Sequence, residues 1–183
     1  MARTPSNSVP LGSDLPAATL PDVVRNQPFE LHSLLGQPSV VMFICNHCPF
    51  VKHLKPALSA FGREYQARGV GIVAISSNDV KSHPNDGPEL MREDAQINSY
   101  TFPYLYDESQ AVARAFDAAC TPEFYAFDAK GKLAYHGQFD DSRPGNGLEI
   151  TGRDLRAAVD ALLVGKRPSE QQTPSIGCNI KWR

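Results

Sequence analysis

The Cys-x-x-Cys formed by Cys45 and Cys48 constrains this chain most, because of what flanks it. The apolar run 40–44 leads into the first cysteine, and apolar residues at three- and four-residue intervals follow the second. The two thiols therefore lie where a buried strand gives way to a helix. Backbone N–H groups at a helix start favour negative charge, so we expect Cys45 to have a lowered pKa and to act as the nucleophile. Cys48, one turn later, is placed to attack the mixed disulfide that Cys45 forms.

Composition describes an ordinary soluble domain. The chain has 183 residues, a hydrophobic content of 42% and a formal net charge of −2, which is enough for one domain with a substantial core. The sequence has no basic run to bind nucleic acid and no apolar segment for a signal peptide or a membrane span. The expected location is the cytoplasm, where thiols stay reduced. Four cysteines there favour redox-active, metal-binding or buried thiols over a static disulfide framework.

The hydrophobic pattern alternates between strands and helices. The expected elements are short strands within 17–24 and 28–35, a strand at 38–44, a helix from 49 to about 69, a strand at 70–75, a helix from 86 to about 99, a short helix after 107, a strand hairpin over 123–127 and 133–138, and a helix over 151–165. Alternating strands and helices followed by a hairpin indicate a mixed sheet with helices on both faces. Asp86 is expected to cap a helix from a solvated loop.

The ends of the chain differ in composition from its centre. Residues 1–13 are rich in Pro, Ser and Asn and predict a flexible arm. Residues 14–165 form the expected domain. The tail, residues 166–183, is polar and then apolar around Cys178, so it is expected either to dock on the domain or to bring that thiol to the site.

Thr121-Pro122, just before the expected strand at 123–127, completes a resemblance to the thioredoxin fold. In that family the proline is cis and packs against the dithiol, and the backbone of the preceding residue is presented to an extended substrate. The segment 15–22 resembles the redoxin branch, which includes AhpC/TSA-type peroxiredoxins. Three further stretches resemble a peroxiredoxin-like subgroup of that branch, namely 45–53, 140–146 and 175–182. The resemblance implies an α/β thioredoxin-like fold, a central mixed β-sheet flanked by helices, with an N-terminal redoxin extension.

The match to either branch is incomplete. Peroxiredoxins carry a Thr-x-x-Cys, in which Cys48 matches the cysteine and Cys45 takes the place of the threonine. They also carry an arginine near the strand that Thr121-Pro122 precedes, and none stands there in this sequence. Thioredoxin has a carboxylate in the strand before its dithiol, and 38–44 has none. The dithiol machinery therefore looks more complete than the peroxidase machinery.

Three other side chains are candidates for the site. His47, when protonated, would stabilise the Cys45 thiolate; the alternative is an exposed turn residue. Cys178 and Cys120 are candidate additional redox thiols. The alternatives are a docked tail for Cys178 and a small buried side chain for Cys120. A zinc signature would show a second close pair of ligands, and none is present, so we expect no metal and no organic cofactor.

The sequence thus favours a cytoplasmic thiol–disulfide oxidoreductase in which Cys45 attacks, Cys48 resolves, and Thr121 and Pro122 bind the substrate. Its expected partners are a protein or small-molecule disulfide, or a peroxide, and a dithiol reductant, with no nucleic acid and no membrane. The resemblance also implies a homodimer as one assembly to test. The alternatives are a peroxiredoxin-like thiol peroxidase with antioxidant activity, and a non-catalytic module that binds a metal or a partner with its cysteines.

Overall fold

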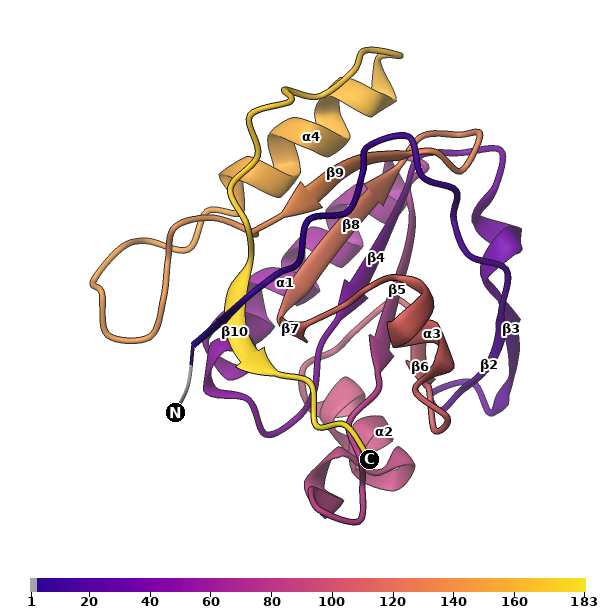
Figure 1. The fold of residues 1–183 in the computed structure, drawn as a ribbon, viewed down its shortest axis with the longest axis vertical. Coiled ribbons are helices and arrows are strands. Elements are labelled where there is room, and N and C mark those ends of the chain that lie inside the picture. The colour runs from indigo at the N-terminus through magenta and orange to yellow at the C-terminus, as the bar shows by residue number, and fades with distance from the viewer. Residues whose placement is uncertain (1–2) are drawn as a thin grey trace.

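The computed structural model describes residues 3–183 and contains one large mixed sheet (Figure 1). Its strands lie in the order β3 (Gln27–Glu30), β2 (Thr19–Asp22), β6 (Tyr104–Tyr106), β5 (Gly71–Ser76), β4 (Ser39–Phe43), β8 (Glu123–Phe127) and β9 (Leu133–Gly137). Strands β4, β5 and β6 run parallel, and the remaining neighbours pair antiparallel. The predicted thioredoxin-like fold with a central mixed sheet is confirmed.

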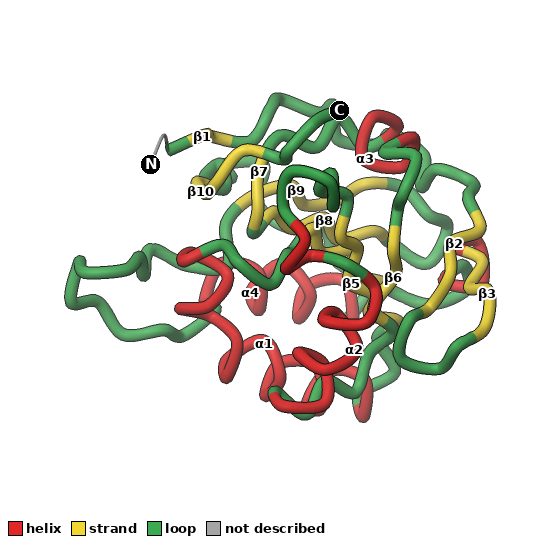
Figure 2. The backbone as a smooth tube through the Cα atoms, turned by 90° about the horizontal axis from the view of Figure 1, so that it is seen from below, coloured by secondary structure: helices red, strands yellow, loops and turns green. Residues whose placement is uncertain are grey.

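Helices cover both faces of this sheet. Figure 2 shows α1 (Pro49–Ala67), α2 (Pro88–Ile97) and α4 (Arg153–Leu163) on one side and α3 (Ala111–Ala115) on the other. Two short 3₁₀ helices, η1 (Leu31–Leu34) and η2 (Pro84–Asp86), lie in the connections. The residues of β4 alternate between the two cores. Val40 and Met42 pack with α1, whereas Val41 and Phe43 pack with α3. A strand buried on both faces needs an unbroken apolar run, which is what the sequence shows here.

Two parts of the large sheet differ from the expected pattern. The segment 28–35 forms only the end of β3 and then turns into η1. Strand β6 was not expected, because three residues are too few to show a period. Its Tyr104 and Leu105 are fully buried, and the strand is defined by parallel pairing with β5. Both differences depend on tertiary contacts that the local pattern does not contain.

The two ends of the chain meet in a second, small sheet. Strand β10 (Ile176–Asn179) pairs with β1 (Thr4–Pro5) on one side and β7 (Cys120–Thr121) on the other. The structure differs here from the expected flexible arm over 1–13, since its described residues include a strand; Met1 and Ala2 lie outside the described residues. The partner of β1 is more than 170 positions away in sequence, so no local pattern indicates the pairing. Within residues 3–183, no helix combines the length and apolarity needed to cross a membrane.

Candidate active site

The dithiol lies at the junction of β4 and α1, as the sequence predicts. Cys48 is the N-cap residue of α1, and Pro49 occupies the first turn, where its missing N–H costs little. Both cysteines contact Thr121. The Cys45 Sγ lies 3.4 Å from Thr121 Oγ1, and the Cys48 Sγ lies 3.2 Å from the carbonyl oxygen of Thr121. The Thr121–Pro122 peptide is cis, as expected. The fold therefore brings together four of the predicted site residues.

The two thiols differ sharply in their ionisation. A hydrogen bond from Cys45 is the largest of the effects that lower the pKa of Cys48 to about 5, and a hydrogen bond from Cys178 and the Val51 N–H add to it against the opposing effect of burial. The pKa of Cys45 is raised well above its ordinary value, first by its hydrogen bond to Cys48, then by burial and by the charge of Asp86. The expectation of a lowered pKa at Cys45 is therefore wrong. Helix α1 begins at residue 49, so its free N–H groups reach the second cysteine rather than the first.

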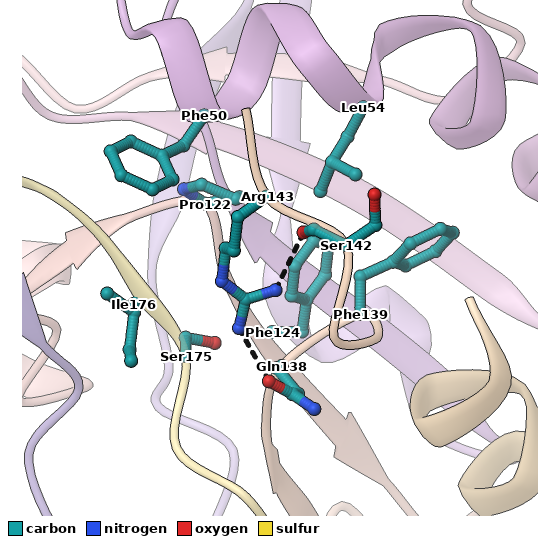
Figure 3. A pocket seen from close by; sticks show the side chains of 10 residues that line it. All are labelled: Phe50, Leu54, Pro122, Phe124, Gln138, Phe139, Ser142, Arg143, Ser175 and Ile176. Atoms are coloured by element: carbon teal, nitrogen blue, oxygen red, sulfur yellow. Dashed lines mark hydrogen bonds between the residues drawn. The ribbon is translucent and has the colours of Figure 1, made fainter. Parts of the chain in front are cut away.

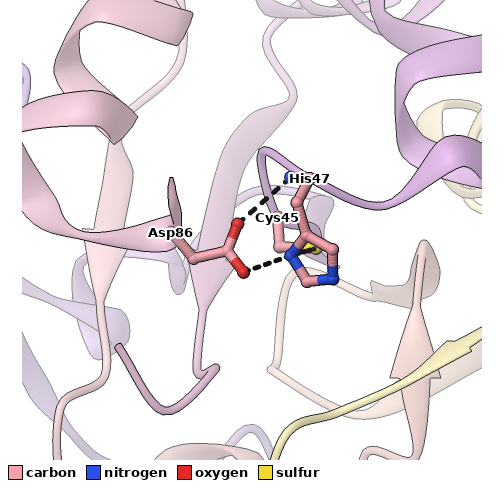
Figure 4. A group of neighbouring side chains, drawn as sticks. All are labelled: Cys45, His47 and Asp86. Carbon is pink, nitrogen blue, oxygen red and sulfur yellow. Dashed lines mark hydrogen bonds and ion pairs between the residues drawn. The ribbon is translucent and has the colours of Figure 1, made fainter. Parts of the chain in front are cut away.

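A buried carboxylate, Asp86, organises the loop between the cysteines (Figure 4). It accepts hydrogen bonds from the Asn46 N–H at 2.8 Å, the His47 N–H at 3.2 Å and Asn78 Nδ2 at 2.8 Å, and its Oδ2 lies 2.5 Å from His47 Nδ1. That same nitrogen is 3.8 Å from Cys45 Sγ. Burial alone would raise the pKa of Asp86, but the hydrogen bonds from His47 and Asn78 outweigh it and lower the pKa below its ordinary value.

His47 is consequently a held side chain rather than an exposed turn residue, with 23% of its side chain accessible. The sequence missed Asp86, which was expected to cap the next helix from a solvated loop. The structure places the N-cap of α2 at Gly87, with no side-chain cap, and leaves Asp86 with no exposed surface. A single acid in a polar segment gives no local signal of this role. Only the packing of η2 against the dithiol loop reveals it.

Three side chains of the site, Cys45, His47 and Asp86, are close enough together to bind a metal ion. The ligand atoms of Cys45, His47 and Asp86 all lie within 4.8 Å of one another. The absence of a second close ligand pair in the sequence argued against a metal, but here a residue about forty positions away supplies the third donor. In this structure His47 Nδ1 is engaged with Asp86, so a metal would have to replace that hydrogen bond.

The tail brings Cys178 to the dithiol. In the pairing of β10 with β7, Cys178 lies opposite Thr121. Its pKa is raised to about 12, first by burial and then by its interaction with the Cys48 thiol. Cys120 faces the carbonyl of Pro122 at 3.9 Å, and burial together with the charge of Glu123 raises its pKa. All four thiols are free and buried.

The pairing also changes the expected role of Thr121. The sequence predicted that its backbone is open to an extended substrate strand, but β10 already pairs at this position. Thr121 is 3% exposed. The chain's own tail therefore occupies the place that a substrate strand would take.

An arginine does lie beside Pro122, although none stands near it in sequence. The loop after β9 carries Arg143 into a hollow that Pro122 and Phe50 also line (Figure 3). The only sequence signal was the resemblance of the run 140–146 to the peroxiredoxin-like subgroup, which carries no assignment for this residue.

A dithiol at the start of the helix after a central strand, facing a cis-proline just before the neighbouring strand β8, places the protein among the thioredoxin-fold redoxins. The chain belongs to the AhpC/TSA family, whose profile matches residues 11–136. Members of this family are thiol oxidoreductases or peroxidases. The curated relative 1-Cys peroxiredoxin PER1 of Zea mays is 24% identical over 164 residues, which are 81% of this chain and 66% of that protein. The chain thus spans slightly less than two thirds of this relative.

Solved structures resemble the whole chain more closely. An uncharacterized conserved protein from Geobacillus kaustophilus is 50% identical with a TM-score of 0.97, covering 100% of this chain and 97% of the other. A hypothetical protein from Sinorhizobium meliloti 1021 is 48% identical with a TM-score of 0.95, covering 98% of both chains. A secreted disulfide oxidoreductase of Mycobacterium tuberculosis, 21% identical with a TM-score of 0.61 over 79% of this chain and 96% of its own, shares the fold.

Proposed function

We propose that the protein is a thiol–disulfide oxidoreductase that uses Cys45 and Cys48 as its redox pair. The observation that carries the proposal is the geometry of the pair, since Cys48 caps α1, Cys45 follows β4, and both sulfur atoms contact Thr121 beside the cis peptide of Pro122. The pKa of Cys48 is lowered, first by its contact with Cys45, and the pKa of Cys45 is raised. A thiolate is the attacking species in disulfide exchange. The resting reduced protein therefore has a nucleophile and a neighbouring thiol that can close the pair.

The reaction then runs in two exchanges. The Cys48 thiolate attacks one sulfur of a substrate disulfide, which forms a mixed disulfide and releases the first substrate thiolate. Cys45 next loses its proton and attacks Cys48 Sγ, which forms the Cys45–Cys48 disulfide and releases the second thiolate. The dithiol gives up two electrons and the substrate gains them. This order reverses the roles expected from sequence, because the charge lies on Cys48. A dithiol reductant restores the pair, with no organic cofactor.

His47 and Asp86 act on the other thiol in this scheme. His47 Nδ1 lies 3.8 Å from Cys45 Sγ, and the short bond to Asp86 holds the ring there. Because the Asp86 carboxylate accepts from Nδ1, the ring presents an N–H beside Cys45, where it is placed to stabilise the thiolate that Cys45 becomes in the second exchange. The Asp86 carboxylate hydrogen-bonds to nitrogen donors of Asn46, His47 and Asn78 and acts on Cys45 through His47, so it is a positioning residue.

A second function, thiol peroxidase, is favoured by a different observation. Cys48 matches the peroxiredoxin cysteine, carries the lowered pKa and contacts the thiol of Cys178. In that reaction the Cys48 thiolate attacks one peroxide oxygen, becomes a sulfenic acid and releases water or an alcohol. Cys178 or Cys45 then attacks the sulfenic sulfur, forms a disulfide and releases water.

The two functions separate in one experiment. Reduced protein is mixed with dithiodipyridine, a neutral disulfide, or with hydrogen peroxide in a stopped-flow instrument, and the product disulfide is mapped by peptide mass spectrometry. Exchange predicts rapid reaction with the disulfide, slow reaction with peroxide and a Cys45–Cys48 bond. Fast reaction with peroxide and a Cys48–Cys178 bond would instead establish the peroxidase. Cys48→Ser should abolish either reaction, whereas Cys120→Ser is the matched control because it removes a buried thiol outside the scheme.

A further inference from the structure

The hollow beside Pro122 has an apolar wall and a cationic centre (Figure 3). It is shallow and opens to solvent, and its enclosed space is about 10 Å³, which is room for a carboxylate oxygen or one water molecule. Its wall is built mainly from Phe50 and Leu54 of α1 and from Phe124 and Phe139, and Arg143 extends into it between Pro122 and Ile176. Phe50 follows Cys48 by two residues, and Pro122 follows the threonine that both thiols contact. The hollow therefore adjoins the dithiol.

The charge of Arg143 has no carboxylate partner. Its guanidinium donates to the backbone carbonyls of Asp140 and Ser142 at 2.5 and 2.8 Å and to Gln138 Oε1 at 2.5 Å. All three acceptors are neutral, and among the described residues no Asp or Glu oxygen lies within 4.0 Å of Arg143. An arginine has five N–H donors, so two remain free. A half-buried guanidinium of this kind is suited to a carboxylate, which accepts from its planar fork.

The carboxylates of the surrounding loop are engaged elsewhere. Asp140 accepts from the N–H groups of Ser142, Thr151 and Gly152. Asp141 forms an ion pair with Arg153. These acids shape the loop without neutralising the Arg143 guanidinium. A negatively charged ligand can therefore form an ion pair with it.

The arginine is also held in place before any ligand arrives. Gln138 Nε2 donates to Asp141 and Asp154, both at 2.6 Å, which turns its Oε1 toward Arg143. Ser142 Oγ donates to the Leu148 carbonyl and lies 2.8 Å from His53 Nε2 of α1. The guanidinium therefore loses little freedom on binding, which favours affinity.

We propose that this hollow binds the carboxylate of a low-molecular-weight disulfide whose charge adjoins an apolar group. The assignment rests on the proposed thiol–disulfide exchange and names the substrate class for the same site. A small substrate is favoured over an extended peptide because β10 already pairs along Thr121. Arg143 takes the carboxylate within the hollow, the apolar side chains at its opening contact the hydrophobic part of the molecule, and the disulfide lies toward Cys48.

Two aromatic disulfides test this class, because one is dianionic and the other is neutral. Stopped-flow rates are measured for dithiobis(nitrobenzoate) and dithiodipyridine with reduced wild type, R143Q, R143K and R153Q. Loss of one charge-assisted contact corresponds to about tenfold or more. The ratio of the anionic to the neutral rate should fall about tenfold in R143Q and partly recover in R143K. R153Q, the matched control, removes one positive charge from the same region, and its ratio should stay within about twofold. Equal ratios in R143Q and R153Q would overturn the proposal.

A binding measurement decides the pocket independently of thiol chemistry. The Arg143 Nε–H resonance of wild-type protein, identified by its loss in R143Q, is followed by NMR during titration with phenylpropionate and with the neutral phenylpropionamide. A saturable shift with the acid alone is expected, and no shift with either compound would overturn the site. If wild type reacts with neither disulfide faster than free cysteine does, the proposed exchange is wrong. The NMR titration still tests whether the hollow binds a carboxylate.

Discussion

One thiol should ionise far below the other three. Cys48 has a pKa lowered to about 5, whereas Cys178 titrates near 12 and the pKa values of Cys45 and Cys120 are raised. Absorbance of reduced protein at the thiolate wavelength in the ultraviolet should therefore rise by one thiolate between about pH 4 and 6. It should then stay level until the other thiols titrate in the alkaline range. Cys48→Ser should remove this step entirely.

The size of the shift follows from the contact between the two cysteines. The Cys45 hydrogen bond is the largest cause of the lowered pKa of Cys48. A hydrogen bond to a charged group contributes about 1.5–3 kcal/mol, and one pKa unit corresponds to about 1.4 kcal/mol. Cys45→Ala should therefore raise the pKa of Cys48 by about 1–2 units. Cys45→Ser keeps an O–H donor and should produce a smaller rise.

The folding equilibrium provides a second readout of the same ionisation. An unfolded cysteine has a pKa near 9, so between pH 5 and 9 the unfolded chain binds the proton that folded Cys48 has lost. The contribution of Cys48 to the free energy of unfolding is fully present above pH 9. It is lost as the pH falls toward 5, by at most about 1.4 kcal/mol per pH unit. Urea unfolding of wild type and Cys48→Ser measures the difference. An acid step that persists in Cys48→Ser, or its absence from wild type, would refute the assignment of the charge.

Two further substitutions test the supports of the site. Asp86→Asn removes a charge that four hydrogen bonds share and should lower the free energy of unfolding by about 3 kcal/mol in urea titrations. This stabilisation is present above the ordinary carboxyl pKa and is lost in acid, because the pKa of Asp86 is lowered in the folded protein; an unchanged midpoint near neutral pH would contradict it. Gly177→Ala places a methyl group against the Thr121 carbonyl, so β10 should separate from β7, at a cost of about 1–3 kcal/mol. Alkylation of Cys178, followed by mass spectrometry, should accelerate.

Local pattern was enough for the elements that carry the dithiol. The apolar run 40–44 indicates a buried strand, and the apolar residues at three- and four-residue intervals after Cys48 indicate a helix with one buried face. The interval between them is long enough only for the loop that carries the cysteines. Thr121-Pro122 was found through a family resemblance, and its cis peptide agrees with that expectation. These features share one property, since each is encoded by residues within one or two elements of the chain.

The remaining parts of the site come from long-range packing. Asp86 reaches the loop at His47 from 39 positions away, and Cys178 reaches Thr121 through pairing between strands far apart in sequence. Arg143 enters the hollow only because Gln138 and the Asp140 loop hold it. Which of the two cysteines has the lowered pKa depends on where the helix begins. The cysteines are three positions apart, and the Cys-x-x-Cys pattern does not say which of them lies at the helix start. Residue identity therefore indicated the chemistry, and tertiary structure assigned the roles.

Burial separates the ionisation of Cys48 from its reactivity. Its sulfur is charged at neutral pH by the argument above, yet the residue is 0% exposed and Cys45 only 1%, so a substrate reaches it only when a covering group moves. Strand β10 both covers Cys48 and donates the Cys178 hydrogen bond that lowers its pKa. Displacing that strand should have opposite effects on the two properties. In Gly177→Ala the pKa of Cys48 should rise while its alkylation rate, compared at a pH where it is ionised in both proteins, should increase. A pKa that rises while the alkylation rate of Cys48 stays the same or falls would mean that access to Cys48 runs past His47 and not past the tail.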